Sequence, residues 1–192
     1  AVSACGKITQ AGDFALTGGS LSLSGIQGIG AFGAVTLSGG ATASFASSSG
    51  ALGLIGAVQA NGSTLTAQAA GRLEGVAGID AHDSSVSLTG GGLINAIGDA
   101  PLERSSFVAE ASGGINSIGI VTARENSDVQ IASSSGALGS IQALRSDASG
   151  ISVYAWDGIA SIGDVWAKNG SEVSIASDLS LGTIEEMVVD SS

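Results

Sequence analysis

The chain has 192 residues, 44% of them hydrophobic, with six Lys and Arg against 17 Asp and Glu and a formal net charge of −11. This charge argues against nucleic-acid binding, which needs clustered cations. The apolar content argues against disorder, and no apolar run reaches the ~18 residues that membrane insertion as a helix requires.

One apolar template recurs along the chain every 21 to 24 residues. Its central column holds branched or aromatic side chains, often followed by glycine: Ile8, Phe32, Ile55, Val76, Ile97, Ile118, Ile141, Ile162 and Ile184. Three residues earlier stand Cys5, Ile29, Leu52, Leu73, Ile94, Ile115, Leu138, Ile159 and Leu181. Three residues later stand Ala11, Val35, Val58, Ile79, Ala100, Val121, Leu144, Val165 and Met187. A fixed period of this length indicates a repeat architecture.

Between these triplets, apolar residues alternate with Ser and Thr, which predicts half-buried strands. The inward pairs, in chain order, are Leu21/Leu23, Ala43/Phe45, Leu65/Ala67, Val86/Leu88, Phe107/Ala109, Val129/Ile131, Ile151/Val153 and Val173/Ile175. Gly, Asn, Asp and Ser separate the strands and favour tight turns.

A unit of about 22 residues cannot bury a core alone, so neighbouring units must stack. The sequence predicts an all-β protein: a single-domain parallel β-solenoid, or β-helix, over residues 1–192, with about nine rungs of ~22 residues each. A leucine-rich repeat is the competing fold, because its Leu spacing and period are similar. The asparagine expected in a leucine-rich repeat is missing here. The half of each unit that would form the convex side of that fold also alternates as a strand does.

The small core residues and glycine-marked turns resemble the Gly/Ser/Ala-rich β-solenoid repeat proteins of bacterial and archaeal cell surfaces, such as adhesins, sheaths and S-layer-like coats. The resemblance implies an extracellular or cell-surface location. The template begins at Cys5 and still appears at Met187 without a capping helix. We therefore expect either a segment of a longer solenoid or ends that stack on other copies, as a homo-oligomer or polymer. The leading expectation is a non-enzymatic structural protein that self-assembles as a sheath, coat, filament or adhesin stalk.

Two alternatives rest on outward residues. Thr42, Thr64 and Thr66 belong to two expected columns of Ser and Thr, and such a hydroxyl face resembles those of ice-binding solenoids. Tyr154 and Trp166 are expected to point outward on neighbouring rungs, where aromatic rings can stack on sugars or a partner protein. A polysaccharide-binding or polysaccharide-cleaving β-helix is therefore the other alternative, although the near-constant rung length leaves no long loop to wall in a substrate.

No catalytic or cofactor-binding residue is predicted. Asp80 and Asp83 flank the single histidine, His82, and are expected in a solvated turn. Asp128 and Glu172 are expected in one outward column, and Asp99 and Asp164 in another. Stacked carboxylates can bind calcium, so calcium is the one cofactor that the sequence leaves open. Cys5 is expected to be a small core residue, with an intermolecular cross-link as the alternative.

Overall fold

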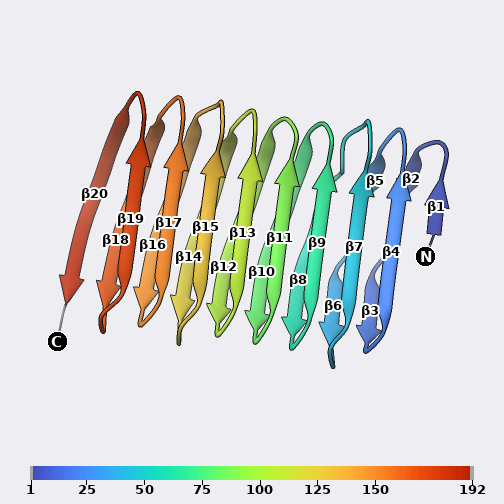
Figure 1. Ribbon diagram of the computed structural model, residues 1–192, viewed down its shortest axis with the longest axis horizontal. Helices are drawn as coiled ribbons and strands as arrows, with labels where there is room; N and C mark the ends of the chain where they lie inside the picture. Colours follow the sequence, from blue (N-terminus) through green and yellow to red (C-terminus); the bar gives the residue numbers. More distant parts are fainter. Residues whose placement is uncertain (1, 191–192) are drawn as a thin grey trace.

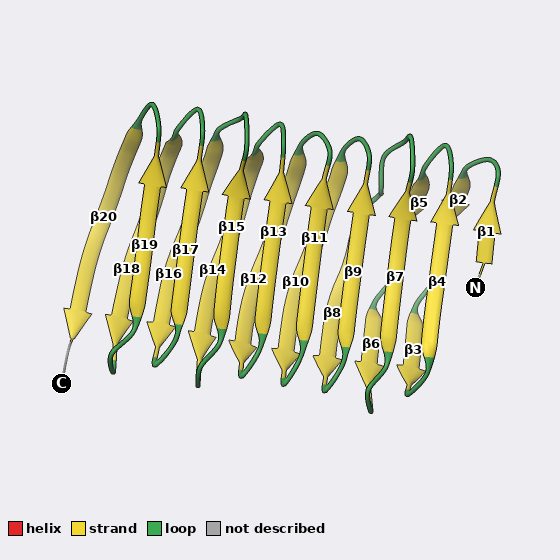
Figure 2. Ribbon diagram, in the orientation of Figure 1, coloured by secondary structure: helices red, strands yellow, loops and turns green. Residues whose placement is uncertain are grey.

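A computed structural model describes residues 2–190, and its chain winds as a coil of parallel strands along one axis (Figure 1). The described residues contain strands, turns and loops but no helix (Figure 2). This confirms the predicted all-β solenoid of about nine turns, spaced about 22 residues apart. The leucine-rich-repeat alternative is wrong, because both long sides of the coil are parallel sheets.

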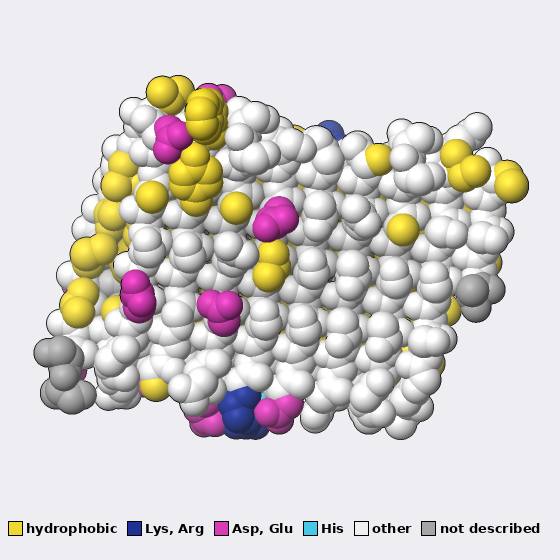
Figure 3. Space-filling model, viewed as in Figure 1, with side chains coloured by type: hydrophobic (Ala, Val, Ile, Leu, Met, Phe, Trp, Pro, Cys, Tyr) yellow, Lys and Arg dark blue, Asp and Glu magenta, His cyan; other side chains and the backbone are white. Residues whose placement is uncertain are grey.

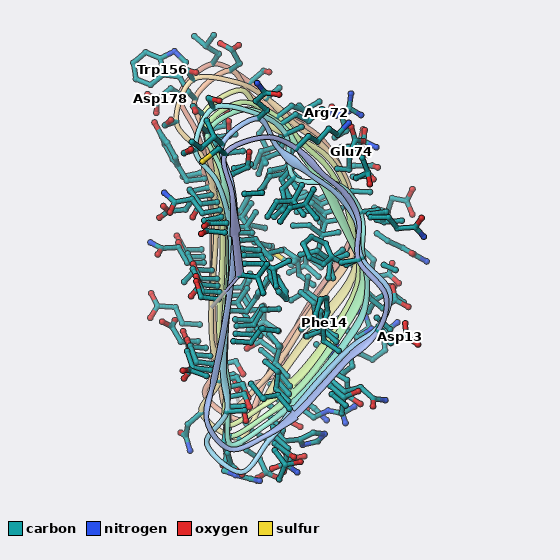
Figure 4. The ribbon with its side chains drawn as sticks, turned by 90° about the vertical axis from the view of Figure 1, so that its right-hand side faces the viewer. Asp13, Phe14, Arg72, Glu74, Trp156 and Asp178 are labelled. Atoms are coloured by element: carbon teal, nitrogen blue, oxygen red, sulfur yellow. The ribbon has the colours of Figure 1, made fainter. Side chains whose placement is uncertain are left out.

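One side of the coil is a nine-stranded sheet, straight in cross-section (Figure 4), which we call the flat sheet. Its strands are β1 (Val2–Ala4), β4 (Ser20–Gly25), β7 (Thr42–Ser47), β9 (Thr64–Ala69), β11 (Ser85–Gly90), β13 (Ser106–Ala111), β15 (Asp128–Ser133), β17 (Gly150–Ala155) and β19 (Glu172–Ser177). Each strand pairs with the corresponding strand one rung away, so equivalent residues stack directly.

The opposite side is a second nine-stranded sheet that bends in cross-section, which we call the bent sheet (Figure 4). Its strands are β3 (Phe14–Thr17), β6 (Val35–Ser38), β8 (Ile55–Asn61), β10 (Leu73–His82), β12 (Ile94–Glu103), β14 (Ile115–Arg124), β16 (Leu138–Asp147), β18 (Ile159–Lys168) and β20 (Leu181–Asp190). In the first rungs a separate pair, β2 (Ile8–Gln10) and β5 (Ile29–Ala31), precedes it. The bend follows from the triplet template, in which two outward residues separate successive inward ones.

The core lies between the two sheets and contains the predicted columns. In the interior rungs the inward pairs of the flat sheet are buried, as the alternation predicted; Val86 and Leu88, for example, are fully covered. The Ile97, Ile118 and Ile141 column of the bent sheet is at most 3% exposed. Burying one such aliphatic side chain contributes about 2 kcal/mol, and each rung supplies the cover for its neighbour.

The first rung differs from the prediction by three residues. Ile8 pairs with Ile29, and Phe14 pairs with Val35, so the first triplet is Ile8, Ala11 and Phe14 rather than Cys5, Ile8 and Ala11. The shift brings Phe14 against two other aromatic rings, with ring centroids 6.0 Å from Phe32 and 5.8 Å from Phe45. Cys5 therefore lies in the turn between β1 and β2 and is exposed, and the expectation of a buried cysteine is wrong.

A column of serines lines the corner where the bent sheet passes into the flat sheet. The Ser105 hydroxyl accepts a hydrogen bond from the Ser84 amide of the preceding rung at 3.1 Å and donates one to the Glu103 carbonyl at 2.8 Å. The same arrangement repeats along the coil, and we call its members the serine column: Ser63, Ser84, Ser105, Ser127, Ser149 and Ser171. Each hydroxyl satisfies an amide that the corner would otherwise leave buried without a partner.

Candidate interaction surfaces

Two columns of hydroxyl side chains stand on the outer face of the flat sheet. Thr42 pairs in register with Thr64, and Thr66 lies two residues farther along the same strand, in the second column. Thr42 is exposed, whereas Thr64 and Thr66 are half-buried between their neighbours. The members are Ser20, Thr42, Thr64, Ser85 and Ser106 in the first column, and Ser22, Ser44, Thr66 and Ser87 in the second. The structure thus places these hydroxyls together as expected.

The hydroxyl columns end at β13 and β15. Val108 continues the second column, and Asp128 continues the first. Asp128 is separated from Glu172 by Gly150, so the two carboxylates lie two rungs apart, about 10 Å at the usual strand spacing. Asp99 and Asp164 also share a column, but three rungs apart, because Ile120 and Ala143 intervene. These four side chains do not stack on one another in adjacent rungs, but Asp164 lies in register with Glu186 of β20.

Tyr154 and Trp166 do not form one aromatic surface. Both point outward, but Tyr154 belongs to β17 of the flat sheet and Trp166 to β18 of the bent sheet. Trp166 is 47% exposed. The alternation identified the outward positions, but the corner between the two strands turns the second residue to the opposite side of the coil.

A third aromatic residue, Trp156, lies close to Tyr154 instead. It is 49% exposed and follows β17 at the corner, beside Asp178 of the next rung (Figure 4). Partial burial and the Asp178 carboxylate raise the pKa of Tyr154. Trp156 lies just past the last residue of the alternating strand, so the alternation does not predict its orientation.

Asp80, His82 and Asp83 lie at the exposed end of β10, in a network of ion pairs. His82 lies 3.2 Å from an Asp80 oxygen and 3.3 Å from a Glu103 oxygen. Arg104 pairs with Asp83 at 2.8 Å, and also with Glu103 and with Glu125 of the following rung. Hydrogen bonds from Arg104 hold the pKa of Asp83 below its ordinary value.

This network is a corner of paired charges. In the stretch from residue 2 to residue 190, no three His, Cys, Asp or Glu side chains gather closely enough to hold a metal ion. The four acidic residues considered for calcium lie in two regions. Asp80 and Asp83 lie at the corner, and Asp128 and Glu172 lie on the flat sheet.

The two ends of the coil expose side chains that interior rungs bury. On β20, Leu181 is 49%, Met187 56% and Val189 68% exposed, whereas Val165, one rung inward in the Met187 column, is 1% exposed. At the other end, Phe14 is only partly buried. The outer edges of β19 and β20 also lack a neighbouring strand among the described residues. Figure 3 shows apolar side chains along the edge formed by the last rung.

Comparisons with protein-family models, curated proteins and solved structures found no match to this chain. The described residues also include no helix of the length and hydropathy needed to cross a membrane.

Proposed function

We propose that this chain is a non-enzymatic structural protein of the cell surface, and that it assembles into a homopolymer by stacking of its solenoid ends. The observation that carries the proposal is the apolar end face of β19 and β20. An exposed, regular sheet edge with apolar side chains is a template for another strand pair. The β-solenoid fold supplies such an edge on both sheets at once.

A second copy has the matching cross-section. Leu181, in the column of Ile159 and Leu138, would meet Ile8, which begins the same column at the other end. Met187 would meet Phe14 in the same manner, since both belong to the column of Val58 and Val165. Apolar residues would thus cover apolar residues, with the backbone edges paired. A head-to-tail contact of this kind does not close and produces filaments.

The supporting features for a structural role are the short connections. From β8 to β20 the strands are joined by two to four residues, so the outer faces carry no loop long enough to form a deep cleft. The acidic balance, with a net charge of −11, also suits a soluble coat component in an extracellular location.

The test is the mass of the protein as a function of concentration, by light scattering and electron microscopy. The wild-type chain is expected to form rods of variable length. Met187→Glu places a charge in the end face and should return the protein to monomers. Thr183→Glu adds the same charge on the outer face of the same strand and should leave assembly intact. A wild-type chain that stays monomeric at millimolar concentration, or equal behaviour of the two variants, would contradict the proposal.

Ice binding is a second candidate, favoured by the in-register hydroxyl columns on the flat sheet. Adjacent rungs repeat the hydroxyl about every 4.8 Å, and residues two apart in a strand repeat it about every 6.7 Å, which produces a regular two-dimensional array. Thermal hysteresis of the purified protein tests this function. Activity that disappears in Thr64→Tyr supports it, and an absence of hysteresis removes it without bearing on assembly.

A further inference from the structure

A cavity of about 250 Å³ opens on the outer face of the bent sheet, near its C-terminal end. Its walls come from two adjacent outward columns. In one column Arg145 is followed by Trp166 on the next strand, and in the other Asp147 is followed by Lys168. Thr122 and Arg124 of β14 form the wall one rung earlier, and Val188 and Asp190 of β20 form the wall on the last rung. The long side chains of the two columns enclose the space between them.

The charge of this cavity is opposite to that of the molecule. Three of the six Lys and Arg residues of the chain line it, against two carboxylates, Asp147 and Asp190, although the net charge is −11. The other arginines of the described chain are neutralised by carboxylates, Arg72 by Glu74 and Arg104 by three acidic neighbours. Arg145, by contrast, is exposed and forms no ion pair with any residue between 2 and 189. In a chain so rich in carboxylates, this guanidinium is left available for an external anion.

The indole of Trp166 supplies the second element of recognition. It is 47% exposed and adjoins Arg145 in the same column, so an apolar ring face and a planar cation lie side by side. An aromatic face packs against the C–H face of a pyranose ring, and guanidinium binds a carboxylate through two parallel hydrogen bonds. A hexuronate presents these two groups on one small ring.

We propose that this cavity binds a uronic-acid unit of an acidic polysaccharide, with Trp166 against the sugar ring and Arg145 on the carboxylate. The Thr122 hydroxyl and the Asp147 carboxylate offer partners for the sugar hydroxyls. Asp147 stays ionised for this purpose, because the Asn169 amide and Lys168 lower its pKa. The volume is at the small end of ligand sites and matches one ring rather than a long chain segment.

The proposal goes beyond end-to-end assembly, and its two main contacts, Arg145 and Trp166, lie on β16 and β18 rather than on the end strand β20. A site of this kind on the side of the rod would attach the assembled protein to an acidic glycan.

Calorimetric titration of the full chain with trigalacturonate tests the proposal, with maltotriose as the uncharged comparison. Trigalacturonate is expected to bind, more weakly as salt is raised, and maltotriose at least tenfold more weakly. Arg145→Gln and Trp166→Ala should each reduce the affinity at least tenfold, and Trp166→Tyr should restore part of it. Because both side chains are exposed, melting temperatures should change little.

Two matched variants complete the experiment. Arg72→Gln removes an equal charge elsewhere, and Trp156→Ala removes an equally exposed indole, so both should leave the affinity within twofold of wild type. No binding of trigalacturonate at millimolar concentration would overturn the proposal. Equal losses in the cavity variants and the matched variants would do so as well, because they would indicate a diffuse electrostatic effect.

Discussion

Replacing Ser105 by alanine should cost more stability than replacing its neighbour Ser106. Ser105 belongs to the serine column and is 4% exposed. Its hydroxyl is the acceptor for the Ser84 amide, 3.1 Å away, and it donates to the Glu103 carbonyl. That carbonyl also accepts from the Asp83 amide at 3.0 Å, so the substitution leaves it with a partner. Only the Ser84 amide loses its acceptor.

An unsatisfied buried donor costs about 1–3 kcal/mol, and we expect Ser105→Ala to lower the free energy of unfolding by that amount. Ser106→Ala removes a half-buried hydroxyl on the outer face of β13 and should change it by less than about 0.5 kcal/mol. The two variants have identical composition, which makes them a close pair.

Urea unfolding measures the difference, and amide hydrogen exchange locates it. The Ser84 amide should exchange faster in Ser105→Ala and unchanged in Ser106→Ala, because only the former removes its acceptor. Equal unfolding free energies for the two variants, together with unchanged exchange at Ser84, would refute the structural role assigned to the serine column.

Three further predictions concern the turns and strands. Gly75 has φ +124°, and a Cβ added there would lie 1.8 Å from a backbone oxygen of the next rung. Gly75→Ala should therefore lower the free energy of unfolding, measured in urea, by more than about 2 kcal/mol. A Cβ added at Gly78 would meet nothing closer than 3.6 Å, so Gly78→Ala should lower it by less than about 0.5 kcal/mol. Arg104 lowers the pKa of Asp83 below 3.8, so the pair stabilises the fold above that pH and its contribution is lost as the pH falls through the lowered pKa of the folded state. The difference in the free energy of unfolding between wild type and Asp83→Asn should therefore narrow from about pH 5 to pH 2. A difference that stays constant with pH would count against the pair. Cys5 is exposed and should react with a disulfide reagent in the folded protein at the rate of a free thiol, whereas protection until unfolding would restore the buried assignment.

The sequence predicted the interior rungs well because two independent patterns agreed there. The alternation around Val86 and Leu88 set which side chains face inward, and the triplet around Ile97 set the register of the opposite sheet. Both patterns are direct consequences of strand geometry and side-chain burial.

The first rung could not be predicted in the same way, because two alignments offered apolar residues at all three template positions. The packing of Phe14 on Phe32 and Phe45 favours one of them, and this contact joins residues of three rungs. A pattern along the chain does not record such contacts. The serine column was readable as a serine every 21 or 22 residues, but a serine beside a turn has the same appearance whether it faces solvent or the interior.

The candidate cavity required information that the sequence does not carry. Its walls join Arg145 and Trp166 of one column with Arg124 and Lys168 of the next, and these residues are up to 44 positions apart. Only the register of β14, β16 and β18 brings them together. The alternation predicted that Trp166 and Tyr154 point outward, but not that they lie on opposite sheets.

Distances between paired spin labels along one column of the flat sheet test the parallel, in-register stacking most directly. In a Cys5→Ser background, labels at Thr42 and Asp128 are four rungs apart, and labels at Thr42 and Glu172 are six rungs apart. At about 4.8 Å per rung, the backbone separations are about 19 Å and about 29 Å. Electron–electron resonance distances centred near these values, and increasing by one strand spacing per rung, are the predicted result. Distances unrelated to the number of intervening rungs would contradict the solenoid.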